Sequence, residues 1–234
     1  MADTKQAIGI ILRRNDFREY DSRILVYTLE HGLLDLVVRG TKRKKSKMVG
    51  HIEPLNLTNL MIAPGKNYDY AASVVATHTW PEVRKNYEAN VVSQKAAKFL
   101  ARVIKPGICD RELLKQLADL MYYMPRSENN IIDFWQAVFV LKALAHLGYR
   151  PNLNKCVQCQ NNDFKTANFD LQNFELYCPK CKTPYHNLTV SREFIKLLQI
   201  VLQQDYKYIA NISYKSSLNQ EISFFCEKYQ QWIE

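Results

Sequence analysis

Residues 1–80 alternate apolar and polar positions in short runs that turn residues separate. The apolar runs cover residues 8–12, 24–27, 33–38, 55–61 and 68–79. His31-Gly32 and Pro64-Gly65 are turn signals between them. A period of two residues is typical of strands with one buried face. Five short strands at this spacing predict a small β-barrel or sandwich.

From Pro81 onward the apolar spacing becomes helical. Asp110 is placed to cap one helix, whose apolar side carries Leu113, Leu114, Leu117, Leu120 and Met121. A second helix carries Ile131, Trp135, Val138, Leu141 and Ala145, and it ends where Gly148 and Pro151 stop a helix. Ser191 is placed to cap a third helix with Phe194, Leu197, Leu198 and Val201. A final helix carries Ile222, Phe225, Tyr229, Trp232 and Ile233 on one face.

These patterns predict an α+β protein. A five-stranded oligonucleotide-binding (OB-fold) barrel fits the first part in size and strand count. An all-helical domain follows, with a small cysteine-rich module inserted into it. We therefore expect four segments: a barrel over 1–80, a first helical part over 81–150, a zinc finger over 151–188 and a second helical part over 189–234.

The cysteine spacing carries the most specific chemistry in the chain. Cys156-x-x-Cys159 is followed, after eighteen residues, by Cys178-x-x-Cys181. Two close pairs at this distance predict one structural Zn²⁺ held by four thiolates. Such a closed site leaves no position for a reactive water, so it favours a structural role over catalysis. A disulfide pair or free thiols are the alternatives.

Other residues near this module, and the remaining thiols, are less informative. His186 lies five residues beyond Cys181 and is expected outside a site that already has four cysteines. Cys109 and Cys226 have apolar neighbours, so we expect both to be buried free thiols. The eighteen residues between the two pairs are enough for a short hairpin.

Net charge and hydropathy narrow the class of protein. The chain has 234 residues and a formal net charge of +9, which favours a polyanionic partner such as nucleic acid. It has no apolar run long enough to span a membrane and no secretory signal pattern, so we expect a cytoplasmic protein. P-loop, dinucleotide-binding, zinc-protease and serine-hydrolase motifs are absent from the sequence, and we expect no enzyme activity.

The densest charge lies in one segment after the third predicted strand. Six of the nine residues from 39 to 47 are basic and none is acidic; they are Arg39, Lys42, Arg43, Lys44, Lys45 and Lys47. Such a loop attracts phosphates without reading bases. The alternative is a solvated loop that keeps the protein soluble. We call this segment the basic loop.

Weaker nucleic-acid candidates lie elsewhere in the barrel region. Arg13 and Arg14 end the first strand, although the acids that follow them could cancel their charge. Tyr68 and Tyr70 are on the same side of a predicted strand and could stack on unpaired bases. Packing within the barrel is the alternative for both rings.

Three segments resemble the bacterial recombination mediator family RecO. The first is residues 7–27, which end in YDSRILVY. The second and most specific is HGLLDLVVRG at 31–40, followed by basic residues, Ser46 and Glu53-Pro54-Leu55. The third is LGYRP at 147–151, followed by Leu153 and the first cysteine pair. The resemblance extends over nearly the whole chain.

The resemblance implies an OB-fold barrel, a helical domain and a zinc finger. It also implies a DNA repair and recombination mediator of the RecF pathway. Such a protein binds single- and double-stranded DNA, anneals complementary strands and helps to load RecA on DNA coated by single-strand-binding protein. RecR and single-strand-binding protein are the implied partners, and the implied location is cytoplasmic and nucleoid-associated. The basic loop falls where the barrel of that family meets DNA.

Two other functions fit the same residues. An RNA-binding barrel would use the same electrostatics on a different polymer. A protein adaptor would use the zinc module as its contact surface and leave the basic loop idle. Preference for structured RNA would favour the first, and nucleic-acid affinity that ignores the basic loop would favour the second.

Overall fold

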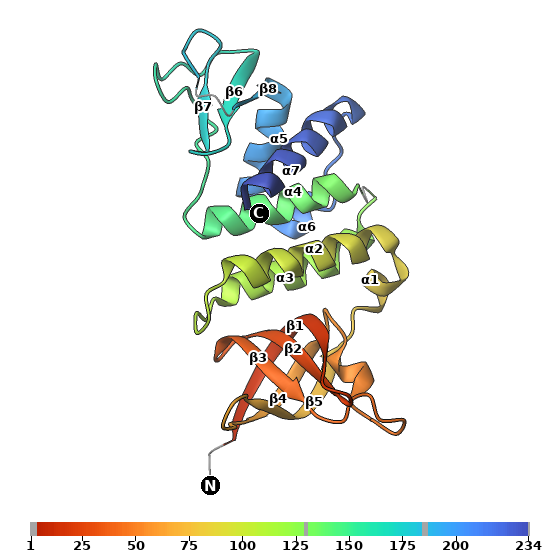
Figure 1. Cartoon of the computed structure of the whole chain (residues 1–234). Helices are drawn as coiled ribbons and strands as arrows, with labels where there is room; N and C mark the ends of the chain where they lie inside the picture. The colour runs from red at the N-terminus through yellow and green to blue at the C-terminus, as the bar shows by residue number, and fades with distance from the viewer. Residues whose placement is uncertain (1–3, 129–130, 184–186, 234) are drawn as a thin grey trace. The chain divides into compact units, whose positions relative to one another are not determined.

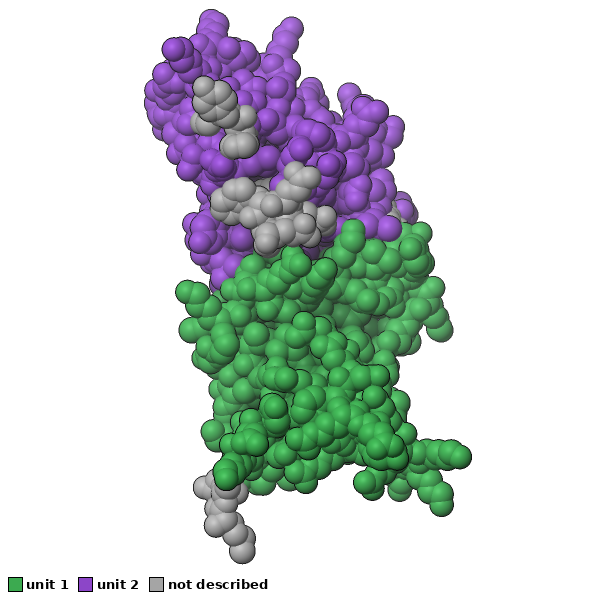
Figure 2. All heavy atoms as spheres, viewed as in Figure 1, with its two compact units in different colours: residues 1–125 green, residues 126–234 purple. Residues whose placement is uncertain are grey.

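The computed structural model describes residues 4–128, 131–183 and 187–233, with side chains described up to residue 228 in the last helix. The chain forms two compact units, residues 1–125 and 126–234, which Figure 2 colours separately. Unit 1 holds the barrel and the helices α1 to α3. Unit 2 holds the cysteine-rich module and the remaining helices. The finer division into four segments stays a prediction.

Five strands close the predicted barrel, which Figure 1 shows at the N-terminal end of the chain. They are β1 (Lys5–Phe17), β2 (Asp21–Thr28), β3 (Gly32–Val38), β4 (Leu57–Ala63) and β5 (Tyr70–His78). Their order is β1-β2-β3-β5-β4, and β1 pairs with both β2 and β4. The pairing of β3 with β5 is parallel, at Val37 and Tyr70, and the other pairings are antiparallel. This closure removes the exposed edges that an open sheet would leave.

The barrel interior is aliphatic. It contains Ala7, Ile11, Ile24, Val26, Leu36, Val38, Ile52, Leu60, Ile62, Ala71 and Val74. In β1 the residues that face the barrel interior are Ala7 and Ile11, and they are not the alternating apolar residues at 8, 10 and 12. Ile8 is 40% exposed, whereas Ile10 is fully buried on the opposite face from Ala7 and Ile11. β1 thus buries apolar side chains on both faces, which a period of two cannot reveal.

Three helices of unit 1 follow the barrel: α1 (Pro81–Lys85), α2 (Tyr87–Val103) and α3 (Arg111–Tyr123). The Asn86 side chain accepts a hydrogen bond from Ala89 N and begins α2. Asp110 caps α3 as predicted, because its carboxylate accepts from the backbone N–H groups of Glu112 and Leu113. α2 lies in a stretch for which the apolar pattern predicts no individual helix. Figure 1 shows α2 and α3 side by side.

Two contacts fix the barrel to the connection between α2 and α3. The fully buried Tyr27 of β2 donates its hydroxyl to Asp110 O at 3.0 Å and accepts from Asp110 N at 2.9 Å. Burial raises the pKa of Tyr27 to about 12, so the hydroxyl stays protonated at neutral pH. Gly32, at φ +66°, lies so close to Ile108 that a Cβ there would be 2.5 Å from Ile108 O. The barrel and α3 are therefore joined through specific backbone contacts.

Unit 2 contains α4 (Ile132–His146), α5 (Arg192–Gln203), α6 (Tyr206–Ile209) and α7 (Asn219–Ile233). Every residue of α4 from Phe134 to Leu141 is buried, so this helix is the centre of the unit. It ends at His146, two residues before Gly148, whose φ is +98°, and Gly148 N donates to Ala145 O and Tyr149 N to Leu144 O. This is the pattern of a Schellman motif and confirms the predicted stop.

A three-stranded sheet, in the order β7-β6-β8, is inserted between α4 and α5. Its strands are β6 (Thr166–Asp170), β7 (Glu175–Tyr177) and β8 (Asn187–Ser191). Phe169 of β6 packs against Phe225 of α7, which also contacts Phe194 of α5. Ser191 caps α5 as predicted by accepting from Phe194 N.

The last predicted helix is present as α7, and its Ile222 and Phe225 are buried as expected. The other three residues assigned to that face, Tyr229, Trp232 and Ile233, lie outside the residues whose side chains are described. Within the described part of the chain, no helix combines the length and apolarity needed to cross a bilayer.

We predict that Tyr27→Phe lowers the free energy of unfolding by about 1–3 kcal/mol, because it removes two part-buried hydrogen bonds between the Tyr27 hydroxyl and the backbone of Asp110. Urea denaturation followed by circular dichroism measures this change. Tyr87→Phe is the matched control, because Tyr87 is 74% exposed. Equal unfolding midpoints for the two variants would contradict the role assigned to the Tyr27 hydroxyl.

Candidate functional site

The two cysteine pairs lie on tight turns at one end of the β6–β7 hairpin. In the first turn Gln160 N donates to Cys156 O at 2.9 Å, with Gln160 in the left-handed region at φ +62°. In the second turn Cys181 N donates to Cys178 O at 3.1 Å. A bond from Val157 N to Leu176 O, 2.8 Å long, ties the first turn to β7. The hairpin thus brings the two pairs together, as the spacing predicts.

The four sulfur atoms converge on one point. All four Sγ atoms lie within 4.8 Å of one another, and the Cys159 and Cys178 atoms are 3.6 Å apart. Sulfur ligands at about 2.3 Å from a tetrahedral ion would be about 3.8 Å apart, so the arrangement fits a metal ion. Cys156 and Cys178 are buried, Cys181 is half-buried and Cys159 is exposed. His186 lies outside the described residues.

The electrostatics of the cluster also favour a cation. Burial raises the pKa of the Cys156 thiol, but hydrogen bonds from backbone groups lower it by more, to about 6. These hydrogen bonds come from Cys178, Cys159 and Gln158. Burial and hydrogen bonds with the other three thiols raise the pKa of Cys181 to about 12. One thiol of the cluster thus ionises easily and another resists ionisation, and binding of a metal ion would release the remaining protons.

The other two cysteines differ from each other. Cys226 is buried as expected, and its thiol donates to Asp133 O at 2.9 Å. Cys109 is exposed, so the expectation of a buried thiol was wrong there. The apolar neighbours of Cys109 belong to the exposed turn between α2 and α3, where Ile108 is 56% exposed. Apolar neighbours in sequence are a poor sign of burial in a turn.

The basic loop is anchored at its root and exposed beyond it. Thr41 is buried, and its Oγ1 lies 2.8 Å from Ser22 Oγ. Gly40 N donates to Asp21 Oδ1 at 2.8 Å, and Lys42 N donates to Tyr20 O at 3.0 Å. The six basic residues of the loop are all exposed. The backbone therefore holds a cationic segment at a fixed point on the barrel.

Within the loop, three basic side chains have neighbours from the barrel. The Lys42 ammonium forms an ion pair with Asp16 at 3.0 Å. The Arg39 guanidinium lies over the Tyr70 ring, 4.0 Å from its centroid, and that of Arg43 lies 5.9 Å from the Tyr20 ring. Lys44, Lys45 and Lys47 extend from the more distant part of the loop. Arginine over an aromatic face adds cation–π attraction to the site.

Aromatic and arginine side chains also alternate beside the loop. The half-buried Tyr68 lies edge-on to Phe17, with ring centroids 5.4 Å apart. Arg23 lies 5.6 Å from the Tyr68 ring, and Arg18 lies 5.1 Å from the Phe17 ring. Tyr68 precedes β5 and Tyr70 begins it. Phe17 was missed in the sequence because one phenylalanine at a strand end carries no pattern of its own.

Arg13 and Arg14 lie apart from this surface. Arg14 pairs with Glu53, and both arginines line a groove between the barrel and α2. The structure therefore groups the predicted candidates into three sets. These are the cysteine cluster, the basic loop with Tyr68 and Tyr70, and the groove with Arg13 and Arg14.

Two family models together match nearly the whole chain. The family model "Recombination protein O N terminal" matches residues 1–80, and the model "Recombination protein O C terminal" matches residues 84–232. The chain belongs to the RecO family. The closed barrel is the OB-fold domain of this family, and the predicted fold class is confirmed.

RecO-family relatives match along nearly their full length. The protein named "DNA repair protein RecO" in Thermoanaerobacter sp. (strain X514) is 25% identical, over 95% of this chain and 90% of the relative. Its namesake in Bifidobacterium adolescentis is also 25% identical, over 96% and 92% respectively. That of Caldicellulosiruptor bescii is 21% identical, over 96% and 91%.

We predict about one metal ion per chain in the purified protein, because the four converging Sγ atoms can hold one ion. Cys156→Ala should lower the content to near zero and destabilise unit 2, because metal binding and local folding are coupled. Elemental analysis and limited proteolysis measure the two effects. Cys109→Ala, which removes an exposed thiol outside the cluster, is the control. Metal-free protein with four free thiols in the cluster would contradict a closed metal site.

Proposed function

We propose that this RecO-family chain is a non-enzymatic mediator of DNA repair and recombination in the RecF pathway. In this proposal it binds single- and double-stranded DNA and anneals complementary strands. It also helps to load RecA on DNA coated by single-strand-binding protein. The observation that carries the proposal is the exposed basic loop on an OB-fold barrel, next to rings that arginines flank.

Annealing follows from the electrostatics of this surface. Two DNA strands repel each other through their phosphates, and six basic side chains on one loop would offset much of that repulsion. Backbone contacts carry no sequence information, so base pairing between the strands supplies the specificity. Six contacts to a single strand would give a salt slope of about −4, at about −0.7 per contact.

The aromatic surface would act on bases rather than on phosphates. The partly exposed rings of Tyr68 and Tyr70 offer faces on which unpaired bases can stack. Their neighbours Arg23 and Arg39 place positive charge where the backbone of a stacked strand would lie. A strand held in this way keeps its base-pairing edges open to a second strand.

The cysteine cluster would hold one structural Zn²⁺ through Cys156, Cys159, Cys178 and Cys181. Zinc is the metal that four thiolates at tetrahedral spacing favour in a reducing compartment. It would fix the sheet against α5 and α7 and leave no position for catalysis. The helices would then provide docking surfaces for RecR and single-strand-binding protein. The proposed location is the cytoplasm, in association with the nucleoid.

We predict that neutralising the basic loop slows strand annealing. The variant replaces Lys42, Arg43, Lys44, Lys45 and Lys47 by Gln, and its salt slope for single-stranded DNA should fall by about 3.5, at about 0.7 per contact. A variant with Arg at the four lysine positions keeps the charge and serves as the control. Fluorescence anisotropy across a salt series measures binding, and quenching of paired dyes measures annealing.

Two outcomes would favour other functions. Unchanged nucleic-acid affinity in the neutralised variant would favour a protein adaptor, because the loop would then be idle. Tighter binding of structured RNA than of single-stranded DNA by the unaltered protein would favour an RNA-binding barrel.

We predict that Tyr68→Leu and Tyr70→Leu weaken binding of single-stranded DNA by about 1–3 kcal/mol for each stacked base that is lost. The salt slope should stay constant, because neither substitution removes a charge. Tyr87→Leu is the control, since Tyr87 is 74% exposed on a helix. If the substitutions weaken the salt dependence and leave the affinity for single-stranded DNA at high salt unchanged, the two rings act only by positioning Arg39 and Arg23.

A further inference from the structure

One face of α2 is basic. The helix has a single acid, Glu88, which lies in its first turn. The helix buries Val92, Ala96 and Leu100 and leaves Gln94, Lys95, Lys98 and Arg102 exposed. Solvated lysines on a helix commonly have an acid three or four residues away. Around Lys98 these positions hold Gln94, Lys95, Ala101 and Arg102. Like charges therefore gather along this face.

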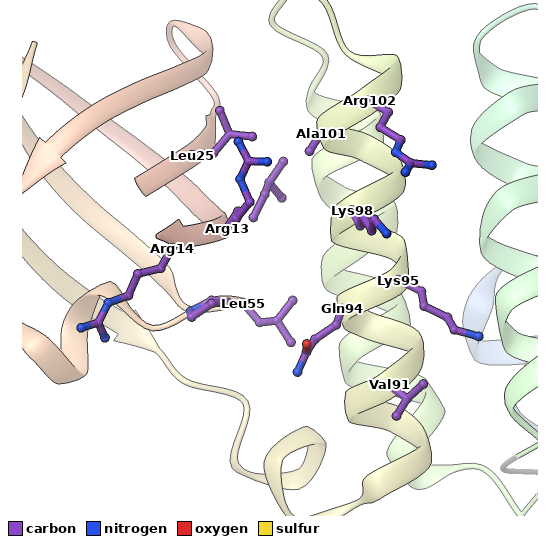
Figure 3. Close-up of a pocket in the computed structure, with 12 residues that line it drawn as sticks. Arg13, Arg14, Leu25, Leu55, Val91, Gln94, Lys95, Lys98, Ala101 and Arg102 are labelled. Carbon is purple, nitrogen blue, oxygen red and sulfur yellow. The ribbon is translucent and has the colours of Figure 1, made fainter. Parts of the chain in front are cut away.

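The barrel contributes to the same place. A groove of about 680 Å³ is lined from the barrel by Leu12, Arg13, Arg14, Leu25, Pro54 and Leu55, and from α2 by the residues of the basic face with Val91 and Ala101. Its lining includes five basic side chains and no acid. In Figure 3, Arg13 rises between the barrel and α2, and Gln94 and Ala101 project toward the barrel. Lys95 and Arg102 extend from the other side of the helix.

We propose that this groove, with Arg13 and Lys98 at its rim, is a second binding site for a nucleic-acid strand. It would hold the second strand while the first lies on the basic loop and its aromatic neighbours. The inference rests on the proposed function, because a second strand matters only if the barrel already binds a first one.

The composition of the groove favours a strand over a small anion. A free phosphate would use the basic rim alone and make no contact with the aliphatic floor, where Leu25 is partly exposed and Leu12 and Leu55 are buried. A nucleic-acid strand can use both, since its phosphates can contact the rim while a base lies against Leu25.

The position of the groove favours a nucleic-acid strand over an acidic peptide. Arg13 lies only three residues before Asp16 on β1, and the Asp16 carboxylate pairs with Lys42 of the basic loop. Three residues of a strand span about 10 Å. The two basic sites therefore share one strand of the barrel and lie about 10 Å apart along it.

The test uses the full chain and two short oligothymidines, one with a donor dye and one with an acceptor dye. Oligothymidines cannot pair with each other, so energy transfer between the dyes reports two strands on one protein. The test variant is Arg13→Gln with Lys98→Gln. Lys5→Gln with Lys105→Gln removes the same charge from exposed positions outside the groove lining and is the control.

The groove variant should bind the first strand as the unaltered protein does and lose energy transfer. Complementary strands should anneal more slowly, and the salt slope for the second strand should fall by about 1.4, at about 0.7 per contact. Arg13→Lys with Lys98→Arg, which keeps the charges, should restore energy transfer and annealing. Sedimentation should show that the complex with two strands contains one protein chain.

Several results would overturn the inference. Unchanged energy transfer in the groove variant would do so while leaving the proposed function intact, because the first strand would still bind. Two protein chains in the complex would assign the strands to different molecules. A polyglutamate peptide that binds the unaltered protein but not the groove variant, with energy transfer unchanged, would make the groove a peptide site. Failure of the unaltered protein to bind any strand would remove the proposed function as well.

Discussion

The outer surface of β1 and β2 is too apolar to face water, and much of unit 1 follows from this constraint. Ile10 and Tyr27 are fully buried although they lie outside the barrel core. Burying each such side chain is worth about 1.5–3 kcal/mol, so exposure of this face would cost a large part of the stability of a small barrel. The helices after the barrel are therefore part of its fold. Tyr27 and Gly32 fix where the barrel meets them.

This cover also decides which surfaces of the barrel remain open to ligands. The basic loop leaves the barrel after β3, with its root held by Asp21, Ser22 and Tyr20 at the start of β2. The anchored root and exposed tip present charge without burying it, which avoids the cost of desolvating a cation. The helices cover part of the outer barrel surface but leave the groove beside α2 open. Two basic surfaces on one compact unit are the result.

Features set by short-range chemistry could be predicted from the sequence. The Asp110 and Ser191 caps, the stop at Gly148 and the convergence of the four cysteines each depend on a few neighbouring residues. Features set by tertiary contacts could not. The alternation of apolar residues correctly predicted a strand at β1. It did not predict which face of β1 points into the barrel, because helices bury the outer face as well. α2 buries small alanines and Ser93, which give a weak apolar signal. The grouping of Phe17 with Tyr68 depends on closure of the barrel.

The junction at Ser191 has a mechanical consequence for the cysteine-rich module. β8 ends at Ser191 and α5 begins at Arg192, so no linker separates sheet from helix. The Ser191 hydroxyl and N–H both donate to the Glu221 carboxylate of α7, at 2.7 Å each. These two hydrogen bonds attach the junction between β8 and α5 to α7 as well. The sheet is thus joined at this point to two helices, unlike a finger attached through one flexible linker. A force applied to the two cysteine turns would therefore be transmitted to α5 and α7 together.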